Sequence, residues 1–240
     1  MKSSFLVSLL PLVQGALGSA EVSGGSPATI DDLPYLVSIS KSGVYTCAGV
    51  IISGDRVATS AQCVYGLEAS PSSFSVRVGS SNTSSGGSAI VVSKIARNAR
   101  FDPATNDFDI AVLKLSSFVT PGPTVKVIDF VQPGQDPADG TECVASGWGD
   151  SGKQLQSVTL PIVNRDTCNQ TSDGQITDRM ICAGSEAGKG TCSGDRGGSV
   201  TCGGKLAGII SQTHGCESLS LPDVFTDIAN SYIQSWTKNQ

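Results

Sequence analysis

Short apolar runs, separated by turns rich in glycine and serine, occupy most of this chain. Residues 74–78 alternate strictly, so that Phe74, Val76 and Val78 share one face, as in a half-buried strand. Similar alternating or clustered runs cover residues 33–40, 47–53, 56–60, 109–115, 143–149, 205–211 and 224–225. The pattern predicts an all-β fold made of many short strands joined by tight turns.

The period of the pattern changes near the end of the chain. Four large residues there recur at helical spacing, namely Ile228, Tyr232, Ile233 and Trp236. They predict a terminal helix over residues 227–238 that packs on the strands, with Thr226 or Asp227 as its cap.

Proline and glycine divide the β-rich part into two lobes. Residues 120–124 read Thr-Pro-Gly-Pro-Thr and interrupt the strand pattern. We therefore expect one lobe over residues 28–122 and a second over residues 123–226. Residues 79–88 are small, polar and rich in glycine, and they are typical of a loop.

The first 20 residues have the pattern of a secretory signal. Lys2 precedes the apolar run 5–10, and small residues at 18–20 suit signal cleavage. A membrane anchor is the alternative, but it needs about 20 continuous apolar residues, and Pro11 and Gln14 interrupt this run. We expect a secreted, extracellular protein.

Charge and cysteine content narrow the class further. The net charge of -5 argues against a nucleic-acid or anionic-membrane partner. Eight cysteines in a secreted chain favour disulfides over metal ligands, and only one histidine, His214, is present. Spacing alone cannot choose among the pairings that eight cysteines allow. Asn82 and Asn169 begin glycosylation sequons.

Five short motifs occur in a characteristic order from residue 22 onward. They are Cys47-Ala48-Gly49, Ala61-Gln62-Cys63, Asp109-Ile110-Ala111, Gly147-Trp148-Gly149 and Gly194-Asp195-Arg196-Gly197-Gly198. In this order they resemble the chymotrypsin/trypsin family of serine proteases, and microbial trypsins in particular. The resemblance implies one trypsin-like domain over residues 21–240, built of two antiparallel six-stranded β-barrels with an active cleft between them.

The resemblance also implies a disulfide pairing and a set of catalytic positions. The implied disulfides are Cys47–Cys63, Cys143–Cys202, Cys168–Cys182 and Cys192–Cys216. The family's histidine, aspartate and serine correspond here to Gln62, Asp109 and Arg196. Glutamine has no group that titrates near neutrality, and a guanidinium carries donors but no acceptor. His214 reads as an exposed loop residue rather than as a replacement base.

These substitutions predict that the chain is not an enzyme. We expect instead a secreted, monomeric protein that binds another protein, such as a hydrolase, a protease or a host protein, and acts as an inhibitor, decoy or effector. No cofactor and no metal are expected. The alternative is a trypsin-like hydrolase with residual or altered activity, because Asp109, the Gly194 loop and the cysteines are retained.

The remaining cleft residues have specific expected roles. The backbone donors of Gly194 and Arg196 are expected to form an oxyanion hole. Gln62 is expected to donate its amide to Asp109. The Arg196 side chain either pairs with a buried carboxylate, Asp109 or Asp223, or binds an anion. We favour the first, since unpaired buried charges are costly.

The resemblance assigns a specificity pocket and an activation site as well. Gly190 stands where trypsin-like enzymes place an aspartate at the floor of this pocket. Asp223 places a carboxylate on the opposite wall, which suits a lysine or arginine side chain, and Thr213 is expected to narrow the mouth of the pocket. In the family, cleavage before residue 22 frees an ammonium that pairs with the aspartate equivalent to Asp195. Glu21 stands where a basic residue is usual, which leaves the partner of Asp195 open.

Overall fold

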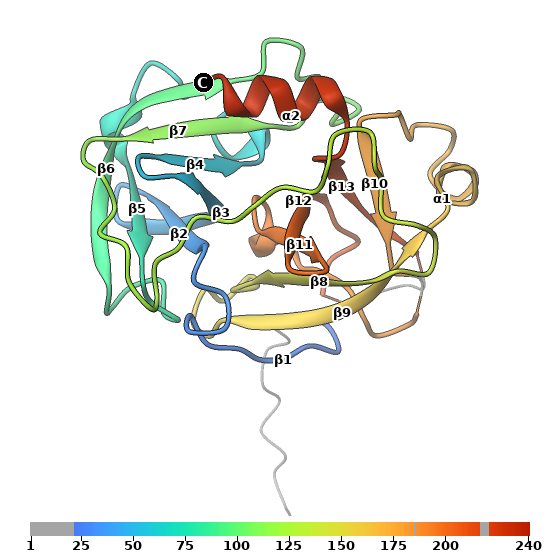
Figure 1. Ribbon diagram of the computed structural model, residues 1–240, viewed down its shortest axis with the longest axis horizontal. Helices are drawn as coiled ribbons and strands as arrows, with labels where there is room; N and C mark the ends of the chain where they lie inside the picture. The colour runs from blue at the N-terminus through green and yellow to red at the C-terminus, as the bar shows by residue number, and fades with distance from the viewer. Residues whose placement is uncertain (1–21, 185, 217–220) are drawn as a thin grey trace, which may run out of the picture.

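The structure is a computed structural model and describes residues 22–184, 186–216 and 221–240. Two β-barrels lie side by side (Figure 1). Six antiparallel strands close the first barrel in the order β2-β3-β4-β7-β6-β5. Their bounds are β2 Leu36–Lys41, β3 Val44–Ser53, β4 Arg56–Thr59, β5 Phe74–Val78, β6 Ser88–Arg97 and β7 Ala111–Leu115.

The second barrel has the strand order β9-β10-β13-β12-β11-β8, and the pairing of β8 with β9 closes it. The short strand β1 (Ser26–Pro27) adds to β9. The bounds are β8 Glu142–Gly147, β9 Gln156–Val163, β10 Met180–Ala183, β11 Ser199–Cys202, β12 Lys205–Gln212 and β13 Asp223–Asp227. The helices are η1 Ala61–Cys63, η2 Pro71–Ser73, α1 Arg165–Thr171, η3 Ser193–Asp195 and α2 Ser231–Lys238.

The expected fold class is confirmed, with two differences in the helices. The terminal helix begins at Ser231 rather than at residue 227, because Asp227 still belongs to β13. Asn230 caps this helix by accepting hydrogen bonds from the first turn, so neither expected cap is correct. Of the two sequon residues, Asn82 lies in the expected loop before β6, and Asn169 lies in α1.

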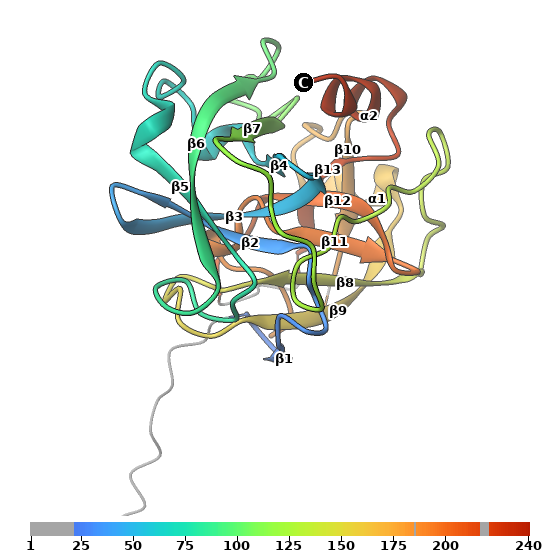
Figure 2. The same ribbon diagram turned by 60° about the vertical axis from the view of Figure 1, so that its left-hand side comes forward.

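An apolar layer joins the two barrels. Leu36 and Val50 of the first barrel pack in one buried cluster with Leu206 and Ile209 of the second. Trp148 is fully buried in this cluster, and its indole N–H donates to the Ser81 carbonyl at 2.8 Å. Figure 2 shows the two barrels from the side, with α2 at one end of the contact. Burial of this layer holds the barrels in one arrangement.

The four disulfides are those that the resemblance implies. Cys47–Cys63 joins β3 to η1 in the first barrel, and Cys192–Cys216 joins the residue before η3 to the segment after β12. The Cys47–Cys63 disulfide lies at the junction between the barrels, with Cys63 Sγ 4.0 Å from the Arg196 carbonyl. No helix in the described part of the chain is long and apolar enough to cross a membrane.

Gly197 fixes the loop after η3 against the first barrel. Its φ is 80°, and a Cβ atom there would lie 2.2 Å from both the Ala48 carbonyl and the Thr59 hydroxyl. The neighbouring Arg196 carbonyl accepts a hydrogen bond from the Ala48 N–H at 2.8 Å. The loop approaches β3 this closely only because residue 197 has no side chain.

We predict that Gly197→Ala lowers the free energy of unfolding by about 2–4 kcal/mol, from strain at positive φ together with the backbone clash. Gly204→Ala is the matched control, since Gly204 also has a positive φ (76°) but open space around its Cβ position. It should cost about 1 kcal/mol. Urea unfolding of the oxidised proteins measures both, and equal losses would contradict the packing argument.

Candidate active site

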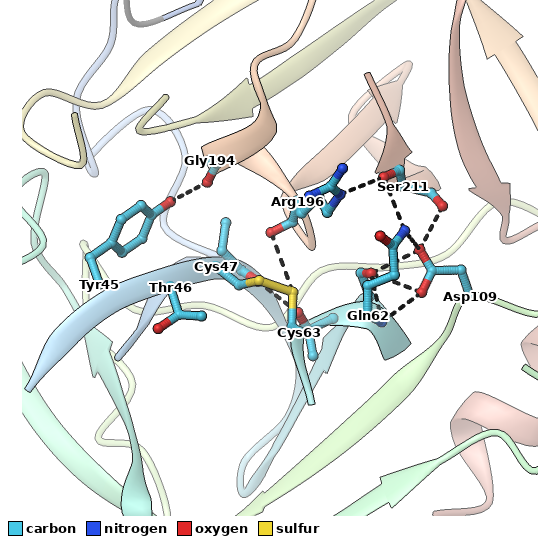
Figure 3. The surroundings of a disulfide bond; sticks show 12 residues. Tyr45, Thr46, Cys47, Gln62, Cys63, Asp109, Gly194, Arg196 and Ser211 are labelled. Carbon is cyan, nitrogen blue, oxygen red and sulfur yellow. Dashed lines mark hydrogen bonds between the residues drawn. A yellow bond between two sulfur atoms is a disulfide. The ribbon is translucent and has the colours of Figure 1, made fainter. Parts of the chain in front are cut away.

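The predicted catalytic positions meet at the junction of the barrels. Gln62 lies in η1 directly after β4, and Asp109 lies just before β7 of the same barrel. Arg196 follows η3 in the second barrel, and Ser211 lies near the end of β12. Figure 3 shows these four residues around one network of hydrogen bonds. The structure therefore brings together all three of the predicted positions.

Asp109 is buried and accepts hydrogen bonds from three residues. The Ser60 hydroxyl donates at 2.8 Å, the Ser211 hydroxyl at 2.5 Å, and the Gln62 backbone N–H at 3.0 Å. Burial raises the pKa of Asp109, and the hydrogen bonds oppose this rise by stabilising the carboxylate. The sequence analysis missed Ser60 and Ser211 as partners. Ser60 carries a local signal, since it is the N-cap of η1, but Ser211 carries none.

The amide of Gln62 holds the position expected for it. Its Nε2 donates to Asp109 Oδ2 at 3.1 Å, which confirms the predicted contact. The same nitrogen lies 3.4 Å from the Ser211 carbonyl. Both interactions use Gln62 as a donor, so this side chain orients groups and takes no proton.

The Arg196 side chain contacts a backbone carbonyl rather than a carboxylate. Its Nε donates to the Ser211 carbonyl at 3.0 Å, and within the described residues no ion pair involves it. The favoured prediction of inward pairing with Asp109 or Asp223 is therefore wrong. Both carboxylates obtain their hydrogen bonds elsewhere, and Arg196 is only partly buried.

The two expected oxyanion donors have partners inside the chain. The Gly194 N–H donates to Asp150 Oδ1 at 2.6 Å, and the Arg196 N–H lies 3.4 Å from the Ser193 carbonyl. The Tyr45 hydroxyl donates to the Gly194 carbonyl at 2.7 Å. The prediction of a free oxyanion hole is therefore wrong in this structure. No local signal in the sequence points to Asp150, because its contact with Gly194 joins segments 44 residues apart.

Asp195 is fully buried and is held by backbone groups. The Gly149 N–H donates to it at 2.6 Å and the Cys192 N–H at 2.8 Å. Burial raises the pKa of Asp195 to about 7, the charges of Asp150 and Asp223 add to the rise, and the two backbone donors oppose it. The predicted signal over residues 1–20 and the Glu21 position lie outside the described residues.

Asp223 of the expected specificity pocket is buried, and its carboxylate has hydrogen-bond partners inside the chain. Asp223 accepts from the backbone and hydroxyl of Thr191 at 2.6 and 2.9 Å, and from the His214 N–H at 3.3 Å. Burial raises its pKa, and these donors oppose the rise. Gly190 pairs through its backbone with Ser23, and His214 is exposed, as expected. The buried Thr213 hydroxyl has no partner among the described residues.

Two six-stranded barrels, with a buried aspartate at their junction and a glycine-rich loop facing it, define the trypsin class of protein. Residues 22–237 match the family described as Trypsin, and the chain belongs to this family. Similar proteins include hypodermin-B of Hypoderma lineatum, 36% identical over 95% of this chain and 88% of its own length. Trypsin Blo t 3 of Blomia tropicalis is 38% identical, with coverages of 90% and 84%.

A third relative, the vitellin-degrading protease of Bombyx mori, is 34% identical over 92% of this chain and 85% of its own length. These matches contradict the prediction that the chain is not an enzyme. Relatives matched over 84% and 85% of their own length are named as a trypsin and as a protease, and this chain belongs to the same family.

The raised pKa of Asp195 predicts a dependence of stability on pH. Between about pH 4, near the ordinary Asp pKa, and about pH 7, the native state binds a proton at Asp195 that the unfolded chain has released. The contribution of Asp195 to the free energy of unfolding therefore falls as the pH rises through this window, and it is constant above the window. Asp195→Asn has no such proton. The unfolding free energy of the wild type minus that of the variant should fall by up to about 4 kcal/mol from pH 4 to pH 8.

Urea unfolding at a series of pH values measures this difference. Asp31→Asn is the control, because Asp31 is exposed, and its difference from the wild type should stay constant. A constant difference for Asp195→Asn as well would refute the effect of burial.

Proposed function

We propose that this trypsin-family chain is a secreted hydrolase of altered activity. It binds a segment of another polypeptide at the junction of the barrels and hydrolyses its acyl bond slowly after a basic residue. The observation that carries the proposal is the position of the Arg196 guanidinium, which is anchored to the Ser211 carbonyl and paired with no carboxylate of the described residues.

Family membership and the site support the trypsin-like part of the proposal. A relative named as a trypsin matches 90% of the chain. Asp109 remains buried beside η1, and the Gly194–Gly198 segment faces it across the junction. Asp223 supplies a buried carboxylate whose charge suits a lysine or arginine side chain of the bound polypeptide.

The altered part follows from Gln62 and Arg196. A guanidinium has no lone pair to attack a carbonyl carbon, and a carboxamide does not accept the proton of a nucleophile. Water is then the nucleophile: its oxygen bonds to the acyl carbon, the bond to the leaving group breaks, and the protons pass to solvent and the leaving group. Arg196 stabilises the negative charge that develops on the carbonyl oxygen.

In worked serine proteases, an oxyanion hole and substrate binding alone leave a rate roughly 10^3–10^4-fold above that of water. In this chain the Gly194 N–H is held by Asp150, and the Arg196 guanidinium takes the place of the oxyanion hole. We therefore predict slow hydrolysis of a p-nitrophenyl ester of N-blocked lysine, at roughly 10^3 times the buffer rate. The reaction should show no initial burst, and a serine-directed phosphonate should leave the protein unlabelled, because Arg196 forms no acyl intermediate.

The same assay on Arg196→Ala, purified in parallel, controls for contaminating proteases and should show a rate near that of buffer. The double variant Gln62→His/Arg196→Ser tests the scaffold, and we expect faster turnover and phosphonate labelling. A wild-type rate equal to that of buffer, or equal to that of Arg196→Ala, rejects the proposal.

Asp223 predicts which ester is preferred. The wild type should hydrolyse the lysine ester at least about tenfold faster than the norleucine ester, which has a similar shape but no charge, since bonds to charged groups contribute about 1.5–3 kcal/mol. Asp223→Asn should remove this preference, and Asp31→Asn should keep it. Competition kinetics with the two esters measures the ratio, and an equal rate for both in the wild type would exclude Asp223 as the selecting residue.

A further inference from the structure

Arg196 brings a fixed positive charge to the centre of the site. We propose that this guanidinium is a receptor for a carboxylate, and that its ligand is the free C-terminal carboxylate of a bound peptide. The inference deepens the proposed function, on which it rests for the place where the peptide lies. It does not depend on turnover, since binding can be measured without hydrolysis.

The guanidinium is anchored but has donors to spare. An arginine side chain carries five N–H donors in one plane. Its Nε–H is used by the Ser211 carbonyl at 3.0 Å, and its Nη groups have no hydrogen-bond or ion-pair partner among the described residues. The bond at Nε fixes the orientation of the guanidinium, so the two Nη groups form a preorganised fork. Because Arg196 is only partly buried, a ligand can reach this fork.

The carboxylates around the site do not neutralise this charge. Asp109 takes its hydrogen bonds from Ser60, Gln62 and Ser211. Asp223 takes its hydrogen bonds from Thr191 and His214. Neither carboxylate forms an ion pair with Arg196 among the described residues, so the Nη groups stay available to a ligand. In Figure 3 the Arg196 side chain extends towards Ser211, and the Gln62 amide and Ser211 lie between the guanidinium and Asp109.

The loop that carries Arg196 already binds carboxylates through its backbone. The Gly194 N–H donates to Asp150 at 2.6 Å, and the Cys192 N–H donates to Asp195 at 2.8 Å. Asp150 is exposed, so its carboxylate is a contact that a ligand can displace. The Gly194 N–H is thus a second donor of this loop, which an anion can use in place of the Asp150 carboxylate.

A peptide C-terminus fits these donors better than a neutral carbonyl does. A carboxylate has two oxygens that match the planar guanidinium fork, and the pair is charge-assisted. The acid product of the proposed hydrolysis carries its new carboxylate where the ester carbonyl was. A glutamate side chain of a bound polypeptide has the same chemistry, and the experiment separates these two sources.

Titration calorimetry with three peptides tests the proposal. The probes are acetyl-Ala-Ala-Lys with a free C-terminal carboxylate, the same peptide with a C-terminal amide, and acetyl-Ala-Ala-Lys-Glu amide, whose only carboxylate is a side chain. We expect the free acid to bind the wild type at least about tenfold more tightly than the first amide. The advantage should shrink as salt is added. The glutamate peptide should bind like the amide.

Four variants locate the effect. Arg196→Gln should bind acid and amide equally, and Arg196→Lys should keep part of the preference, because it keeps the charge but not the fork. Arg100→Gln is the matched control: Arg100 is exposed, and its guanidinium lies over the rings of Phe108 and Tyr232. It should keep the full preference. Asp150→Ala should bind the acid more tightly than the wild type, since it frees the Gly194 N–H.

Equal binding of acid and amide by the wild type overturns the proposal, as does an undiminished preference in Arg196→Gln, or no measurable binding of the acid at millimolar concentration. If the glutamate peptide binds more tightly than the free acid, Arg196 recognises a side-chain carboxylate, and the proposal of a C-terminal carboxylate as the ligand is overturned. Circular dichroism verifies the fold of each variant, and a titration of free thiols verifies that its disulfides are formed. Acid-selective binding without ester turnover would reject the proposed hydrolysis alone.

Discussion

The structure of the site depends on the burial of one carboxylate, Asp109. A charged group in an apolar junction is costly unless donors surround it. The donors are supplied by η1 of the first barrel and by Ser211 of the second, so the network ties the two barrels together where the cleft lies. Removing any one donor would leave a buried charge less well compensated.

This arrangement also explains why Arg196 does not turn inward. An ion pair with Asp109 would require the guanidinium to displace hydroxyl and amide donors that are already in place, and to lose its own hydration. The Ser211 carbonyl satisfies one donor at 3.0 Å while the rest of the group stays near solvent. The carbonyl thus accepts from both Arg196 and the Gln62 amide, which fixes the two substituted positions relative to each other.

The cleft loop adds a steric constraint to this electrostatic one. Gly197 lets the chain pass next to β3, and the Arg196 carbonyl takes the Ala48 N–H. The buried Asp195 side chain of this loop accepts hydrogen bonds from the Gly149 and Cys192 N–H groups. The exposed Asp150 accepts a hydrogen bond from the Gly194 N–H of the loop. The loop is therefore held from both barrels, which gives Arg196 a fixed position on it.

The sequence alone predicted the class of fold, because the strand-like pattern is local. Its resemblance to the trypsin family, carried by short motifs in a fixed order, implied the four disulfides and the residues at the junction. It also predicted the Gln62–Asp109 contact, since a carboxamide beside a buried carboxylate has one favourable orientation. It placed the terminal helix too early, because Asp227 belongs to a strand whose pairing is long-range. The partners of Arg196 and Gly194 were decided by the tertiary structure only. Ser211 and Asp150 reach them from distant segments, and which donor meets which acceptor depends on how the two barrels pack.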